Sequence, residues 1–184
     1  MSLTQTARAF LRPGEAPGTL IRTAWNGLAP LPGGKRLFSQ VLGRAAPYTG
    51  SLGAQVVELS PGHSKVVLRD RPAVRNHLRS VHAIALANLA ELTGNVALAY
   101  SLPDDARFIV AGLSIEYLIK ARGTITGTCS LEPITSSERH EYDVSVEMHD
   151  ASGALVARAN LRTLVGPRKA DQDRRVSRRA TRRG

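Results

Sequence analysis

Short runs rich in β-branched residues stand on both sides of one long apolar segment. Two runs precede it, "GAQVVELS" at 53–60 and "SKVVLRD" at 64–70, and Pro61-Gly62 between them predicts a hairpin. Four further runs follow the apolar segment and also suit strands, at 107–122, 124–134, 140–150 and 154–165. The pattern therefore predicts two strands, a helix and about four more strands.

The last two runs carry the clearest alternation of apolar and polar residues. In the run 140–150, Tyr142, Val144, Val146 and Met148 alternate with Asp143, Ser145, Glu147 and His149. Such alternation is typical of an antiparallel sheet with one covered face and one wet face. The intervening "DASG" is a good hairpin turn.

The long apolar segment lies within "VRNHLRSVHAIALANLAELTGNVAL", Val74 to Leu98. Its apolar residues cover most of the circumference of a helix, which predicts a helix buried on nearly all sides. One antiparallel sheet curled around one helix satisfies this requirement. We therefore expect an α+β fold in which the sheet wraps around a long central helix.

Residues 1–50 are rich in Pro and Gly and contain two helical patterns, at 19–29 and 35–45. We interpret them as an N-terminal helical extension that packs on a main domain at 51–166. The remaining residues, 167–184, carry eight Lys and Arg against two Asp, with Val176 as their only large apolar residue. We predict a disordered basic tail, because such a segment buries too little apolar surface to offset its ordering entropy.

Composition fits one globular domain of ordinary size. The 184 residues are 42% hydrophobic and 22% charged, and Cys129 is the single cysteine, so no disulfide can form within the chain. No run approaches the ~20 apolar residues of a membrane span, and the first residues lack the apolar core of a secretory signal. We expect a cytoplasmic protein that uses no membrane.

A net charge of +10 is typical of a protein that binds nucleic acid. More than half of this charge, however, lies in the tail and not in the predicted folded domain. None of the eight aromatic residues of the chain lies in that tail to stack on bases. The tail could bind phosphate-rich polymers loosely or keep the protein soluble. The sequence thus argues against a dedicated nucleic-acid partner.

Polar residues within the apolar segment are the candidates for chemistry. Glu91 is a carboxylate on a helix predicted to be buried, where it needs either a structural partner or a function. Asn76 and His82 precede it, and Ser80 is placed to cap the helix. The N–H groups of His82 and Ala83 would then be free donors in the first turn, as a developing oxyanion requires.

The spacing places these groups too far apart for one copy of the helix. Nine residues at ~100° each put His82 and Glu91 on opposite faces and ~13 Å apart along the axis. Two antiparallel copies across a two-fold axis would bring the first turn of one helix to Glu91 of the other. If these residues share a site, the protein is an obligate homodimer, with a tetramer of two dimers left open.

The segment from Gly53 to Val165 resembles the hotdog fold, and specifically the PaaI-type acyl-CoA thioesterases and uncharacterised families grouped with them. The motif of these thioesterases is an Asn, followed by His-Gly-Gly and then by an Asp or Glu of the central helix. Asn76, His82, Ala83 and Glu91 match these positions. The resemblance implies hydrolysis of an acyl-CoA at a dimer interface, with no cofactor besides the coenzyme A of the substrate.

The same resemblance assigns roles to the matched residues. The Ala83 amide would polarise the thioester carbonyl, and Glu91 of the other subunit would activate a water or attack the carbonyl. Asn76 would hold the water or nucleophile, while His82 would orient its neighbours. Ala83-Ile84 replaces Gly-Gly, which keeps the N–H but narrows the approach to it. A non-catalytic protein that binds an acyl chain or acyl-CoA therefore stays open, and so does a hydratase or dehydratase.

Other chemistry has weaker support. His77 and His82 are five residues apart and no third ligand lies near them in sequence, which argues against a metal site. Cys129 lies in the middle of a predicted strand with no basic neighbour, as a small buried apolar residue would.

Overall fold

The computed structural model describes residues 16–168, and within them six strands form one antiparallel sheet in the order β1-β2-β4-β5-β6-β3. The two predicted hairpins are confirmed: β1 pairs with β2 across Pro61-Gly62, and β5 pairs with β6 across residues 150–153. The strands are β1 (Gln55–Ser60), β2 (His63–Leu68), β3 (Ala106–Tyr117), β4 (Ile125–Ser130), β5 (His140–His149) and β6 (Leu155–Pro167).

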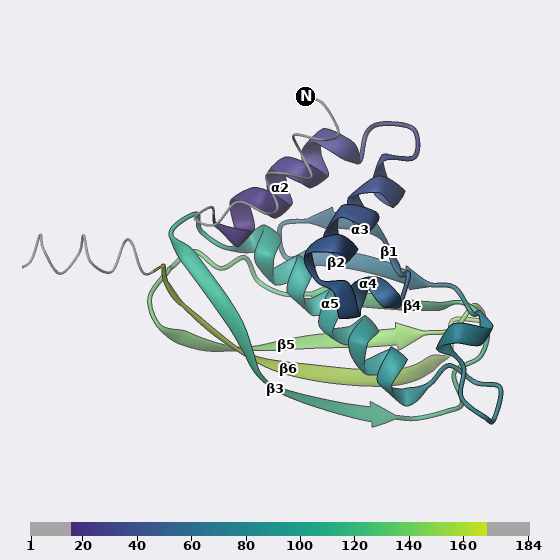
Figure 1. Ribbon diagram of the computed structural model, residues 1–184. Helices are drawn as coiled ribbons and strands as arrows, with labels where there is room; N and C mark the ends of the chain where they lie inside the picture. The colour runs from purple at the N-terminus through teal and green to yellow at the C-terminus, as the bar shows by residue number, and fades with distance from the viewer. Residues whose placement is uncertain (1–15, 169–184) are drawn as a thin grey trace, which may run out of the picture.

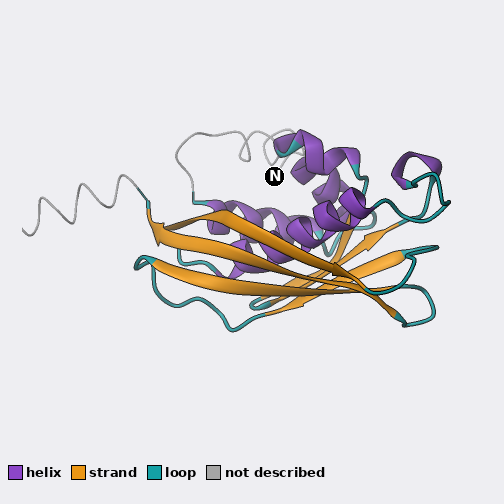
Figure 2. Ribbon diagram, turned by 90° about the horizontal axis from the view of Figure 1, so that it is seen from below, coloured by secondary structure: helices purple, strands orange, loops and turns teal. Residues whose placement is uncertain are grey.

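The long helix α5 (Ala83–Ser101) crosses the inner face of this sheet, and the other helices lie on the same side (Figures 1 and 2). Its small and branched apolar residues are buried nearly all round, as the pattern predicts. The expectation that no segment approaches the length and apolar character of a membrane span was wrong. By length and composition alone, α5 is long and apolar enough to cross a membrane. Most of it is nevertheless buried against the sheet, which is the arrangement of a core helix.

Two glycines allow the helix and the sheet to approach closely. A Cβ atom on Gly94 of α5 would stand 2.9 Å from Leu161 Cδ1 and 3.1 Å from Val144 Cγ1. On the other side of the contact, a Cβ atom on Gly127 of β4 would stand 2.7 Å from Thr93 Oγ1. These positions hold α5 at a fixed height above β4, β5 and β6.

The predicted alternation of β5 is confirmed. Val144, Val146 and Met148 are buried beneath α5, whereas the intervening polar residues face outward. On the outer face Asn160 donates to Asp143 over 2.7 Å, and Arg162 pairs with Glu141 over 3.2 Å. The outer face of this part of the sheet is therefore polar.

The N-terminal segment forms helices on the side of α5 that the sheet leaves open (Figure 1). The two predicted helices are confirmed as α2 (Pro17–Leu28) and α3 (Gly34–Ala45), and a short helix that we did not predict follows, α4 (Pro47–Ser51). Trp25 of α2 meets Phe38 of α3 edge-on, with ring centroids 5.1 Å apart. Both rings belong to the same apolar core as α5.

The boundaries at residues 51 and 166 stay a prediction. The N-terminal helices share one core with the segment that follows. The predicted disordered tail falls almost wholly on residues 169–184, which lie outside the described residues.

Candidate functional site

The loop before α5 is held by the side chain of Asn76. Its Oδ1 atom accepts hydrogen bonds from the Leu78 N–H at 2.9 Å, the Ser80 N–H at 3.2 Å and the Ser80 hydroxyl at 3.1 Å. The short 3-10 helix η1 (Pro72–Val74) leads into this loop. The oxygen of Asn76 is thus used by the loop, while its Nδ2 donates to none of the described residues.

His82, and not the expected Ser80, caps α5. His82 has an extended backbone, with φ −65° and ψ 141°, and its Nδ1 accepts the Ile84 N–H at 3.1 Å. Ser80 is buried and bonded to Asn76 instead. Because His82 lies outside the helix, the angle about the helix axis that we expected between His82 and Glu91 does not apply.

One of the two expected free amides is occupied. The His82 N–H donates to the Val74 carbonyl over 2.8 Å, so it is not available to a ligand. Ala83 is the first residue of the helix, and among the described residues its N–H has no acceptor. The Ala83 amide is therefore a free donor at this end of α5, where the helix dipole favours negative charge.

Side chains around this amide are largely apolar and exposed. Ile84 is 54% exposed and Leu78 is 51% exposed. Across from them, the Tyr117 hydroxyl at the end of β3 donates to the Ala83 carbonyl over 3.1 Å. Burial raises the pKa of the Tyr117 phenol. The first turn of α5 is thus tied to the edge strand of the sheet.

Glu91 lies two turns further along α5, in a different setting. It lines a cavity of about 270 Å³ whose other walls are mostly apolar and come from α2, α3, α4 and β3. Among the described residues no cation or hydrogen-bond donor pairs with its carboxylate. The arginine partner that would make Glu91 purely structural is therefore absent from residues 16–168. Asn95, one turn on, is the other polar residue of α5 in this cavity.

One chain does not bring these groups together. Eight residues separate Ala83 from Glu91, which is about 12 Å along the helix axis. Asn76, His82 and Ala83 lie at the N-terminal end of α5, whereas Glu91 lies in the cavity further along the helix. A site that uses both groups requires a second copy of the helix.

The edge strand β3 presents a surface to which a second copy could bind. Its inner face carries Leu113, which is 42% exposed, and Tyr117, which is 46% exposed. Leu118 and Ile119 continue this exposed apolar surface after the strand. Because β3 pairs only with β6 among the described strands, its other edge has unpaired backbone groups.

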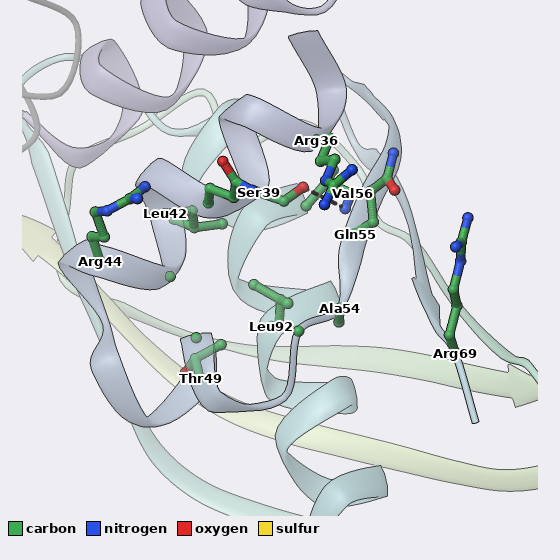
Figure 3. A pocket seen from close by; sticks show the side chains of 14 residues that line it. Arg36, Ser39, Leu42, Arg44, Thr49, Ala54, Gln55, Val56, Arg69 and Leu92 are labelled. Carbon is green, nitrogen blue, oxygen red and sulfur yellow. Dashed lines mark hydrogen bonds between the residues drawn. The ribbon is translucent and has the colours of Figure 1, made fainter. Parts of the chain in front are cut away.

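A second cavity, of about 590 Å³, lies between α3, α4 and the start of β1 (Figure 3). Arg36 and Arg44 of α3 and Arg69, just after β2, stand around it. These three arginines and Asn95 were not predicted from the sequence. Asn95 is signalled by its i+4 spacing from Glu91, whereas no local spacing relates Arg69 to the two arginines of α3.

Two other residues of interest lie outside the Glu91 cavity. Leu92 and Phe108 line that cavity, but Asn88 and Cys129 do not. Asn88 is buried beneath α4, with one 3.4 Å hydrogen bond to the Tyr48 carbonyl. Cys129 is buried as expected, and burial raises the pKa of its thiol to about 12.

Comparison with solved structures defines the class of this fold. The chain resembles a probable thioesterase from Pseudomonas aeruginosa (21% identity, 75% of this chain, 97% of that chain, TM-score 0.66). It also resembles a thioesterase from Haemophilus influenzae (13% identity, 72% of this chain, 90% of that chain, TM-score 0.62). The chain thus has the hotdog fold of thioesterase-family proteins, as the sequence resemblance implied.

The family is defined by a second comparison. Residues 34–165 match the model of DUF4442, described as a domain of unknown function, and the chain belongs to that family. A structural-genomics protein is 31% identical over 80% of this chain and 99% of its own, with a TM-score of 0.71. No curated protein matches the chain significantly.

Proposed function

We propose that the protein hydrolyses an acyl thioester, such as an acyl-CoA, at a site shared by two copies of the chain. The observation that carries this proposal is the Glu91 carboxylate, which lines an apolar cavity and has no partner among the described residues. Glu91 is half-buried in one chain, and a second copy placed over its cavity would shield the unpaired carboxylate from water, which is costly unless the carboxylate has a function. Thioesterases with the same fold support the reaction class.

In the proposed dimer, the edge strands β3 pair across a two-fold axis and cover the apolar surface around Leu113 and Tyr117. The first turn of α5 from one copy then faces Glu91 of the other. This arrangement would bring the Ala83 amide of one copy close to the Glu91 carboxylate of the other. It uses the edge of the sheet at which β3 has no other described strand beside it.

The reaction would use one group from each copy. Glu91 accepts a proton from a water, whose oxygen attacks the thioester carbonyl carbon. The Ala83 N–H stabilises the negative oxygen that forms, the C–S bond breaks, and the departing thiolate takes up a proton. His82 positions the Ala83 amide by capping the helix, and the free Nδ2 of Asn76 is the group that could hold the water.

The backbone around Ala83 allows a clean test of the amide. Proline is favoured at the first position of a helix and lacks an N–H, and the preceding His82 already has the extended backbone that proline demands. Ala83→Pro should therefore remove the donor and keep the helix, whereas Ala83→Gly keeps both. We expect Ala83→Pro to reduce thioester turnover about 100-fold or more, and Ala83→Gly to retain it.

A thiol-detecting dye can follow this turnover, because Cys129 is buried and its thiol has a raised pKa. Equal activity of Ala83→Pro and Ala83→Gly would contradict the role of the amide. Loss of turnover in Glu91→Gln, with the fold retained in circular dichroism, is the matching expectation for the carboxylate.

Binding without hydrolysis is the second candidate, and the position of Ile84 favours it. This exposed side chain is attached one residue beyond the amide that the carbonyl must reach. If Ile84 blocks the approach, wild type binds an acyl-CoA without turnover and Ile84→Gly gains turnover. If wild type already hydrolyses the thioester, this second candidate is excluded.

A further inference from the structure

The second cavity, shown in Figure 3 and called the arginine pocket below, is lined by positive charges alone. Arg36, Arg44 and Arg69 line it, and no acidic residue is among its lining residues. The remaining polar groups are neutral, and they include Gln40 and Gln55. A concave surface with cations and no anions favours a negatively charged ligand.

The three pocket arginines are exposed, and like Arg79, Arg107, Arg122 and Arg139 they are not engaged by another described residue, whereas further arginines are. Arg75 and Arg162 pair with carboxylates, and Arg22 donates to backbone carbonyls and to Asp104. The three pocket arginines have no hydrogen-bond or ion-pair partner among residues 16–168. Their guanidinium groups can therefore bind a phosphate without first breaking a bond within the protein.

The walls of the pocket are formed before any ligand binds. The Ser39 hydroxyl of α3 accepts the Val56 N–H of β1 over 3.0 Å, and Lys35 Nζ donates to the Val57 carbonyl over 2.7 Å. Helices α3 and α4 meet without side chains between them, since a Cβ atom on Gly43 would lie 2.9 Å from Gly50 Cα. A preformed pocket needs little ordering when it binds a ligand.

The arginine pocket adjoins the Glu91 cavity. Leu42, Thr49 and Leu92 line both of them. One side of this shared wall is cationic, and the other is apolar with Glu91 in it. The pair of cavities therefore fits a molecule with an anionic head and an apolar chain.

We propose that the pocket of Arg36, Arg44 and Arg69 binds the phosphate-bearing head of an amphiphile whose acyl chain enters the Glu91 cavity. The inference deepens the proposed function and rests on it for the identity of the chain as the acyl group of a substrate. The chemistry shared by possible heads is a phosphate ester. Arg36 and Arg44 are about 12 Å apart along α3, which favours a head with more than one phosphate.

The test is calorimetric binding to the full chain with probes that cannot be hydrolysed. S-octyl-CoA carries the chain and several phosphates, octyl phosphate carries the chain and one phosphate, and N-acetyl-S-octylcysteamine carries the chain alone. Inorganic phosphate is the fourth probe. The variants are Arg36→Gln, Arg69→Gln and the double variant Arg36→Gln/Arg44→Gln. Arg139→Gln is the control, since it removes one exposed arginine that lines neither cavity.

Each single pocket variant should weaken S-octyl-CoA binding about tenfold, the double variant should weaken it further, and the control should change it less than about twofold. N-acetyl-S-octylcysteamine should bind all variants alike. If octyl phosphate binds as tightly as S-octyl-CoA, the result supports the proposal with a lipid-like head that has a single phosphate. If octyl phosphate binds more weakly, the result supports the proposal with a nucleotide head. The proposal is overturned if the pocket variants bind S-octyl-CoA like wild type, or if Arg139→Gln weakens it equally. It is also overturned if inorganic phosphate alone binds as tightly.

Turnover separates this proposal from the proposed function. The thioester N-acetyl-S-octanoylcysteamine has no phosphate, so the arginine variants should hydrolyse it as wild type does. If wild type hydrolyses no thioester but binding still depends on the arginines, the hydrolysis is contradicted and the phosphate site stands. If turnover requires Glu91 while the arginine variants bind every probe normally, the hydrolysis stands and the phosphate site falls.

Discussion

The Nδ1 atom of His82 accepts the backbone N–H of Ile84 over 3.1 Å, so this histidine caps the central helix. A residue expected to take part in catalysis, from the sequence resemblance alone, thus has a structural hydrogen bond of its own. The cap orients the first turn of α5 and with it the free amide of Ala83.

Removal of the His82 cap should lower the free energy of unfolding. We expect His82→Ala to lower the free energy of unfolding by about 1 kcal/mol and His82→Asn to lower it less, because asparagine is a strong N-cap. Urea unfolding followed by circular dichroism measures both. If His82→Asn keeps stability and turnover, the imidazole acts only as a cap; equal destabilisation by both substitutions would contradict the capping role.

Asp70 ties the loop before α5 to the rest of the protein. Arg75 donates to its carboxylate over 2.7 and 3.1 Å, and the Gly123 N–H donates over 3.1 Å. The Arg75 hydrogen bonds, with the Gly123 bond, hold the pKa of Asp70 below its ordinary value. A lowered pKa in the folded state stabilises the fold above the unfolded-state pKa of about 3.9, and this contribution disappears as pH falls through the folded value.

Asp70→Asn should therefore be less stable than wild type at pH 7, and the difference should shrink when unfolding is measured near pH 3. Glu132→Gln, at an exposed position, should change stability little at either pH. A difference between Asp70→Asn and wild type that is the same at both pH values would show that the charge of Asp70 is not the cause.

Gly94 tests the close approach of α5 and the sheet. Ala at this position should lower the free energy of unfolding by about 1–3 kcal/mol, since its Cβ would press on Leu161 and Val144. Gly166→Ala is the matched control, because nothing lies within 4 Å of a Cβ atom there. Equal thermal midpoints for the two variants would contradict the predicted packing.

Leu113 tests the proposed dimer. A lysine on this exposed inner-face position should prevent association and leave a folded monomer, as judged by sedimentation and circular dichroism. Leu31→Lys places the same charge on an exposed leucine far from β3 in sequence and should leave the dimer intact. A dimer that survives Leu113→Lys, or that forms in neither protein, would contradict pairing through this surface.

The fold was largely predictable because its signals are local. Pro61-Gly62 and residues 150–153 mark hairpins, the alternation in β5 marks the covered face, and the all-round apolar pattern of α5 requires a sheet that curls around it. The helix α4 was missed because five residues are too few to show a period. The order of strands in the sheet depends on contacts distant in sequence.

The site was predictable only in part. The pattern identifies Glu91 as unusual, since a carboxylate stands out in an apolar helix. It does not show that His82 and not Ser80 caps α5, because both side chains can accept a backbone N–H. The arginine pocket was missed for another reason, as Arg69 joins Arg36 and Arg44 only through the packing of α3 against β1 and the pairing of β1 with β2.

The central claim is that each site combines Glu91 of one copy with the Ala83 amide of the other, and mixing two inactive variants tests it most directly. Glu91→Gln and Ala83→Pro are unfolded together, refolded as a mixture, and assayed for thioester turnover. Random pairing of the two chains restores one intact site in each mixed dimer, so about one quarter of wild-type activity should return. If the mixture stays as inactive as its components although mixed dimers form, the two groups do not share a site across the interface.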